Sequence, residues 1–264
     1  NGAGKSTLMN IIYGIYRPDA GSILVNGQKV RITSPKDAMA HGIGMVHQHF
    51  MLIGRFNAVE NVTLITPDAS WSLLKKKEIR ASLEELKARY GIEVDLDCPV
   101  EQLSISMQQK IEILKLLYTG ADILILDEPT AVLLPQECEA LFEIIRHMAQ
   151  QGKGVIFISH KLDEVLQISQ RVDVLSHGRI TGEVETAQAD KDLIVRMMSG
   201  DNVPDMSGYV KKPPQEEAAL SCTGLVAFDD RKVRTLDGVD LTVHRGEIVG
   251  VAGVEGNGQD ELAE

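Results

Sequence analysis

The sequences NGAGKST at residues 1–7 and ILILDEPT at residues 123–130 decide the fold. In the first, Gly2 and Gly4 allow backbone N–H groups to approach an anion, and the helix-prone run that follows places a helix N-terminus there. In the second, an apolar run typical of a strand buried on both faces ends in the carboxylates of Asp127 and Glu128. Together they predict a phosphate site at one edge of a parallel sheet.

Composition is that of an ordinary globular protein. The 264 residues are 44% hydrophobic and 25% charged, which suffices for one large core or two moderate ones. A formal net charge of −11 argues against non-specific binding to nucleic acid, so no nucleic acid partner is expected. The apolar runs are far shorter than the roughly 20 residues that cross a bilayer. Any membrane role is therefore expected to depend on a partner.

Helix and strand patterns alternate over the first 200 residues. The expected helices lie at residues 7–15, 74–90, 107–118 and 139–150. The expected strands and hairpins lie at residues 22–32, 42–48, 121–130, 154–159 and 171–184. This alternation predicts an α/β fold with a parallel core sheet and an added antiparallel part.

We predict a first domain over residues 1–200, a linker over 201–218 and the start of a second domain over 219–264. The linker holds three prolines among mixed charges. Because a phosphate loop normally follows a buried strand, and this chain begins inside one, we expect an internal piece of a longer protein.

A second glycine-rich loop, GVEGNGQDEL, occupies residues 253–262. It has Gln259 and Asp260 where the first loop has Lys5 and Ser6. A repeat of a whole domain accounts best for the two loops.

The first loop carries groups suited to a nucleoside triphosphate with Mg²⁺. Lys5 supplies a positive charge, and Ser6 supplies a hydroxyl that can ligate Mg²⁺. The residues expected to contact ATP are Asn1, Gly2, Ala3, Gly4, Lys5, Ser6 and Thr7.

The end of the apolar strand carries groups suited to hydrolysis. Asp127 is expected to hold the Mg²⁺, and Glu128 to orient and deprotonate the attacking water. His160, which follows the strand VIFIS, is expected to contact the γ-phosphate, although a lone histidine more often has a structural role.

Five motifs in this order, NGAGKST, GMVHQ, LSISMQQ, ILILDEPT and VIFISH, resemble the ATPase domain of ABC transporters. The resemblance covers essentially the whole chain and implies a P-loop NTPase with antiparallel and helical subdomains. It implies that Gln48 reaches the Mg²⁺ and the attacking water and couples them to a membrane subunit. It also implies that His160 is the switch histidine, and that residues 131–134 exchange contacts across a dimer of ATPase domains.

Residues 103–109 resemble the signature loop, which in this family caps the ATP held by the partner domain. The residues expected to contact that ATP are Ser104, Ser106 and Gln108. The family usually has glycine at position 106, so Ser106 adds bulk where backbone and phosphate come close. The resemblance pairs this loop with the 253–258 loop, which lacks a lysine. Only the Lys5 site is therefore expected to turn over ATP.

The runs GIGMVHQHFMLIGRFNAVENV and DEPTAVLLPQE narrow the resemblance to the tandem ATP-binding subunit of bacterial importers for simple sugars and nucleosides. That implies membrane permease partners, indirectly a substrate-binding protein, and a place at the cytoplasmic face of the membrane. The alternative is a soluble tandem ABC ATPase that acts on ribosomes. That class normally keeps lysine in both loops and has a long basic linker, unlike the short proline-rich stretch here.

Overall fold

The structure is a computed structural model that describes residues 3–47, 50–65, 73–199, 215–228, 234–251 and Leu262. The chain divides into two compact units, Asn1–Val203 and Pro204–Glu264. Several residues of the sequence predictions lie outside the described ones: Asn1, Gly2, Gln48, most of the 201–218 linker and the 253–258 loop.

The first unit contains eight described α-helices. They are α1 (Lys5–Ile12), α2 (Pro35–Ala40), α3 (Ala58–Ile65), α4 (Leu73–Tyr90), α5 (Ile105–Tyr118), α6 (Pro135–Gln150), α7 (Leu162–Ile168) and α8 (Lys191–Ser199). Its strands are β1 (Ile23–Val25), β2 (Gln28–Val30), β3 (Ile43–Val46), β4 (Ile123–Asp127), β5 (Gly154–Ile158), β6 (Arg171–Ser176) and β7 (Arg179–Glu185). Short 3₁₀ turns occupy Val100–Gln102 and Thr186–Gln188.

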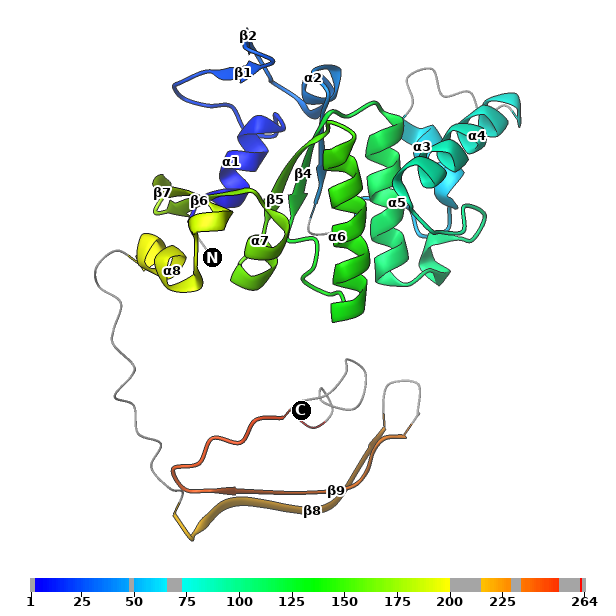
Figure 1. Ribbon diagram of the computed structural model, residues 1–264. Coiled ribbons are helices and arrows are strands. Elements are labelled where there is room, and N and C mark those ends of the chain that lie inside the picture. The colour runs from blue at the N-terminus through cyan, green and yellow to red at the C-terminus, as the bar shows by residue number, and fades with distance from the viewer. Residues whose placement is uncertain are drawn as a thin grey trace. The chain divides into compact units, whose positions relative to one another are not determined.

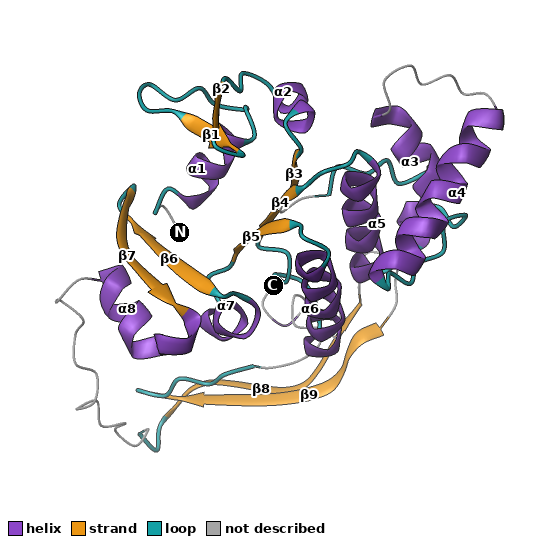
Figure 2. Cartoon of the chain, turned by 45° about the horizontal axis from the view of Figure 1, so that its top comes forward, coloured by secondary structure: helices purple, strands orange, loops and turns teal. Residues whose placement is uncertain are grey.

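Three parallel strands form the core sheet in the order β3-β4-β5, as Figure 2 shows. In the central strand, Ile125 is level with Met45 of β3 and Ile156 of β5. The hairpins β1-β2 and β6-β7 are antiparallel. This arrangement confirms the predicted α/β fold class.

Alternate residues of β4 face two different cores. Leu124 and Leu126 pack with α3, α4, α5 and α6, whereas Ile125 packs with α1, α2 and the β1-β2 hairpin. Figure 1 shows α1 on one side of the sheet and α5 and α6 on the other. Because both faces are covered, the strand can be apolar at each position from Ile123 to Leu126.

Helix α1 begins at Lys5, two residues before the expected start at residue 7, and ends at Ile12 rather than at residue 15. It ends early because Gly14 adopts φ +81, and an added Cβ there would lie 2.6 Å from the Ser34 carbonyl oxygen. Glycine is the residue that tolerates both the left-handed backbone and this close approach.

Two other helices also begin earlier than expected. Helix α5 begins at Ile105 because Ser104 is its N-cap, with the Ser104 hydroxyl accepting from the Met107 N–H at 3.3 Å. Helix α6 begins at Pro135, and the Glu137 carboxylate accepts from the Leu134 N–H at 3.0 Å. Proline in the first turn and a glutamate that reaches back are signals that the sequence contained.

Both predicted hairpin turns are present. Asn26 and Gly27 have φ of 50 and 76, and His177 and Gly178 have φ of 49 and 75. Positive φ at both central residues is the geometry that matches the twist of paired strands.

The second unit is an antiparallel ladder of β8 (Ala218–Phe228) and β9 (Arg234–His244). The runs ALSCTGLVAF at 219–228 and GVDLTVHRGEIVGVAGVEGNGQ at 238–259 predict a hairpin that leads into a strand and a glycine-rich turn. The structure has a hairpin, with Cys222 opposite Leu241, but residues 247–251 form no strand. Across the described part of both units, no helix combines the length and apolar composition needed to cross a membrane.

Candidate active site

The phosphate-loop residues meet the turn of the β6-β7 hairpin. Gly4 has φ +98, and an added Cβ on it would lie 3.3 Å from the Gly178 Cα. The Gly178 N–H donates to the Ala3 carbonyl at 2.9 Å. Among the described residues no side chain caps α1 at Gly4, so its first N–H groups remain available to an anion.

Asp127 ends β4 opposite Ile158 of β5 and is only 9% exposed. Burial raises the pKa of Asp127 above its ordinary value, and a hydrogen bond with the Ser6 side chain opposes that rise. The neighbouring Glu128 raises the Asp127 pKa further, whereas the charges of His47 and Lys5 lower it. The fold thus brings Lys5, Ser6, Asp127 and Glu128 together, although Lys5 and Asp127 are more than a hundred residues apart in sequence.

Glu128 is held from two directions. Its N–H donates to the Ile158 carbonyl at 2.9 Å, and its Oε1 lies 3.1 Å from Nδ1 of His160. The Glu128 backbone has φ 48, a left-handed conformation that is uncommon for a glutamate. Such backbone strain is typical of functional positions.

A group of supporting contacts, which sequence reasoning missed, lies beside Glu128 and His160. The Glu164 carboxylate accepts from the Thr130 hydroxyl and, at 3.2 Å, from the Ser159 hydroxyl. Lys161 Nζ donates to the Thr130 carbonyl at 2.9 Å. These contacts join the turn after β4 to the start of α7. The signal in the sequence was the spacing of Glu164, four residues after His160, at the beginning of a helix.

Two oxygen groups at the site fit Mg²⁺. The Asp127 carboxylate is largely withdrawn from water, and the Ser6 side chain is near enough to lower its pKa. Hydroxyl and carboxylate oxygens are the protein ligands that Mg²⁺ takes together with phosphate oxygens. The third expected ligand, Gln48, lies outside the described residues.

The expected signature residues lie at the start of α5. The Gln108 side-chain amide donates to the Leu103 carbonyl at 3.0 Å, and Ser104 caps the helix. Ser106 is half-buried in the first turn. No hydrogen bond found within the described ranges joins these three residues to Lys5 or Asp127.

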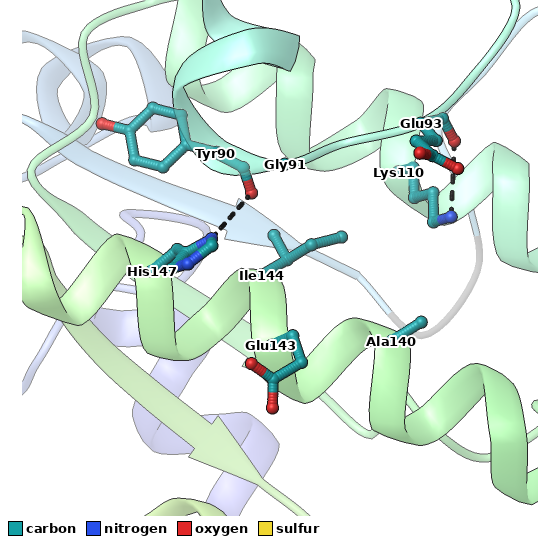
Figure 3. A pocket seen from close by; sticks show the side chains of 8 residues that line it. All are labelled: Tyr90, Gly91, Glu93, Lys110, Ala140, Glu143, Ile144 and His147. Carbon is teal, nitrogen blue, oxygen red and sulfur yellow. Dashed lines mark hydrogen bonds between the residues drawn. The ribbon is translucent and has the colours of Figure 1, made fainter.

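A cavity of about 220 Å³ lies where the end of α4 meets α5 and α6, as Figure 3 shows. Its lining residues are Tyr90, Gly91, Glu93, Lys110, Ala140, Glu143, Ile144 and His147. His147 Nδ1 lies 3.4 Å from the Tyr90 carbonyl, and Lys110 Nζ donates to the Glu93 carbonyl at 3.3 Å. None of the expected site residues lines this cavity, so it is not the nucleotide site.

The sequence profile described as "ABC transporter" matches residues 1–131. The chain belongs to this family of ATP-binding proteins. It is 44% identical to the glucose import ATP-binding protein TsgD13 of Haloferax volcanii, over 100% of this chain and 53% of that protein. It is 42% identical to the guanosine import ATP-binding protein NupO of Bacillus subtilis, over 100% of this chain and 52% of that protein.

A solved ABC transporter structure has a similar fold. It is cbiO1 from Clostridium perfringens, part of an ABC transporter complex, with a TM-score of 0.62 and 28% identity over 74% of this chain and 78% of that one. The similarity confirms the predicted fold class, an ABC-type ATPase domain. The present chain spans about half the length of the curated relatives it matches, at 53% and 52%.

Proposed function

We propose that this chain is part of an ATP-hydrolysing subunit that energises import of a simple sugar or nucleoside through a membrane permease. The observation that carries the proposal is the 3.1 Å contact of the Glu128 carboxylate with His160, next to Asp127, a buried carboxyl whose pKa Ser6 and Lys5 lower. The relatives named for glucose import and for guanosine import support these solute classes.

ATP is the proposed substrate of the Lys5 site. The backbone of residues 1–7 and the Lys5 ammonium would hold its phosphates, and Ser6, Asp127 and Gln48 would hold Mg²⁺. Bound Mg²⁺ supplies positive charge that stabilises the phosphoryl group during transfer. Gly4 has the backbone that such a loop needs, with φ +98 at the start of α1.

Glu128 is the proposed general base. Its carboxylate would accept a proton from the water that attacks the γ-phosphorus, as the bond from that phosphorus to the leaving ADP oxygen breaks. The His160 imidazole, 3.1 Å away, would hold the carboxylate in place, with its other nitrogen near the γ-phosphate. Its side chain is 58% exposed, so a substrate can reach it.

We propose in addition that Ser104, Ser106 and Gln108 act on ATP held by a second ATPase domain of the same protein, which begins near residue 219. In that domain the loop at 253–258 lacks a lysine and is followed by Asp260, so it should tolerate triphosphate charge poorly. The site formed with it would bind ATP weakly and hardly turn it over.

The proposed location is the cytoplasmic face of a bacterial membrane, bound to permease subunits and served indirectly by a substrate-binding protein. The test is to purify the intact protein from membranes after co-expression with candidate sugar and nucleoside permeases from the same genome. The expected result is co-purification with the permease and ATPase activity that rises in its presence. Recovery with ribosomes, and no permease, would favour the ribosome-acting alternative.

A further inference from the structure

Helix α5 holds the loop that follows Gln48 by both backbone groups of one residue. The Met51 N–H donates to Glu112 Oε1 at 2.8 Å, and the Met51 carbonyl accepts from Lys115 Nζ at 3.2 Å. Glu112 and Lys115 lie 61 and 64 residues away in sequence and are one turn apart on the helix. Met51 is 67% exposed, so α5 holds it through these backbone hydrogen bonds.

Glu112 and Lys115, which make these two hydrogen bonds, form a buried ion pair. Lys115 Nζ lies 2.6 Å from Glu112 Oε2, and the residues are 7% and 3% exposed. A buried ion pair rarely adds stability over a pair of apolar side chains of similar size, because withdrawing both charges from water is costly. Apolar side chains, however, could not donate to and accept from the same peptide backbone.

A second helix holds the same loop two residues further on. The Asn61 amide of α3 accepts from the Ile53 N–H at 2.8 Å and donates to the Ile53 carbonyl at 3.2 Å. The loop is thereby fixed to both α3 and α5. Met51 lies three residues after Gln48, and the signature residue Ser104 is the N-cap of α5. Helix α5 therefore has the signature residues at its N-terminus and, in its middle, the two residues that hydrogen-bond to the backbone of Met51.

The ion pair also lies within electrostatic range of the active site. Burial lowers the pKa of His47, with Glu112 and Asp127 opposing the change and Lys115 adding to it. Burial, and secondly the Glu112 charge, raises the pKa of Tyr13, whose ring contacts that of His47 in an edge-on arrangement. The pair is therefore next to the strand end that leads into Gln48.

We propose that Glu112 and Lys115 are positioning residues that fix the Gln48 loop to the signature helix through the backbone of Met51. The proposal rests on the proposed function, since it gives Gln48 a role at the Mg²⁺ and the attacking water. A movement of α5 would pass directly to the loop, because the two hydrogen bonds hold one peptide residue from both sides. Glu112 and Lys115 touch no substrate.

The test compares three variants of the intact protein. Glu112→Gln and Glu112→Leu both remove the negative charge and leave Lys115 unpaired, but only glutamine keeps an oxygen that accepts from the Met51 N–H. The double variant E112K/K115E keeps opposite charges in the core but places a donor against the Met51 N–H. Hydrogen–deuterium exchange at Met51 is measured by fragmentation mass spectrometry, with α6 amides as the internal control.

The expected result is an increase in Met51 exchange of at least about ten-fold in Glu112→Leu and in the double variant, and of less than about three-fold in Glu112→Gln. The same two variants should lose kcat for ATP about ten-fold while KM changes less than about two-fold. If the ion pair only stabilised the core, Met51 exchange and kcat in the double variant would be close to those of wild type. Glu112→Gln and Glu112→Leu would then give similar values, and these results would overturn the proposal.

Two further outcomes are decisive. If Glu112→Leu does not fold, the double variant alone decides the comparison with Glu112→Gln. If neither variant folds, the exchange rate of the Met51 amide in the wild-type protein is the test. Exchange as fast as in an unstructured peptide would contradict the proposed hydrogen bond from Met51 to Glu112. Hydrogen exchange does not depend on catalysis. A wild-type protein without ATPase activity would therefore overturn the proposed function, whereas the contact of Glu112 and Lys115 with Met51 would still be tested by the exchange rates.

Discussion

The His160 Nδ1 atom lies 3.1 Å from the Glu128 Oε1 atom, across 32 residues of sequence. The contact exists because β4 and β5 are parallel neighbours, so that Asp127 and Ile158 are level and the residues after them meet at one edge of the sheet. The Glu128 N–H also donates to the Ile158 carbonyl, so the backbone of Glu128 is fixed to the end of β5. The proposed hydrolysis depends on this edge of the sheet, where β4 and β5 end.

Replacing His160 tests the contact without disturbing the core. Because the imidazole is 58% exposed, His160→Ala should leave the melting temperature nearly unchanged. It should lower kcat by at least about ten-fold, since Glu128 loses a partner that orients it. The control is His41→Ala, at an exposed histidine after α2. Equal activity of the two variants in a phosphate-release assay would remove His160 from the mechanism.

Asp127 should oppose stability at neutral pH. Its folded-state pKa is raised, chiefly by burial, so its contribution to stability is present at low pH and is lost as pH rises through the folded pKa. Asp127→Asn should therefore melt higher than wild type near pH 7 while losing nearly all ATPase activity. The difference in melting temperature should shrink as pH is lowered towards 4. A difference that grows on acidification would contradict the assigned cause.

ATP binding should require glycine at position 4, both because its backbone is left-handed and because it lies close to the β6-β7 turn. Gly4 and Gly21 have φ of +98 and +93, but only an alanine at Gly4 would meet another residue, the Gly178 Cα at 3.3 Å. Gly4→Ala and Gly21→Ala should each lose about 1 kcal/mol of stability from the backbone strain. Only Gly4→Ala should weaken ATP binding as well, by at least about ten-fold in a calorimetric titration. Similar ATP affinities for both variants would count against the phosphate loop at this position.

Ser106 should matter little to turnover. It lies in the first turn of α5, in the loop that we pair with the second phosphate loop, the one without lysine. Ser106→Gly should therefore leave the ATPase rate of the intact protein within about two-fold, because the site it serves contributes little. A several-fold gain would refute the proposed difference between the two sites.

The sequence was sufficient for the elements whose signals are local. Asn26-Gly27 and His177-Gly178 marked both hairpins, and the apolar run at 123–126 marked a strand covered on both faces. Helix starts were less well predicted, because the periodic pattern of apolar residues begins after the cap. The caps at Ser104 and Leu134 correct those starts.

The contacts between distant segments could not be predicted from residue patterns. Glu112 and Lys115 have the spacing of an ordinary surface pair on a helix, and nothing local shows that both are buried against Met51. The same holds for Glu164, which accepts from Thr130 across 34 residues. Such partners are set by how α5 and α7 pack against loops that are remote in sequence.

The central claim is that one pocket, built from the Lys5 loop and the ends of β4 and β5, hydrolyses ATP. Its most direct test is to measure ATP affinity and single-turnover hydrolysis for the intact protein with Glu128→Gln. The account predicts an affinity within about three-fold of wild type and hydrolysis slowed by about one hundred-fold or more, since only the general base is lost. Hydrolysis by Glu128→Gln at the wild-type rate would contradict it.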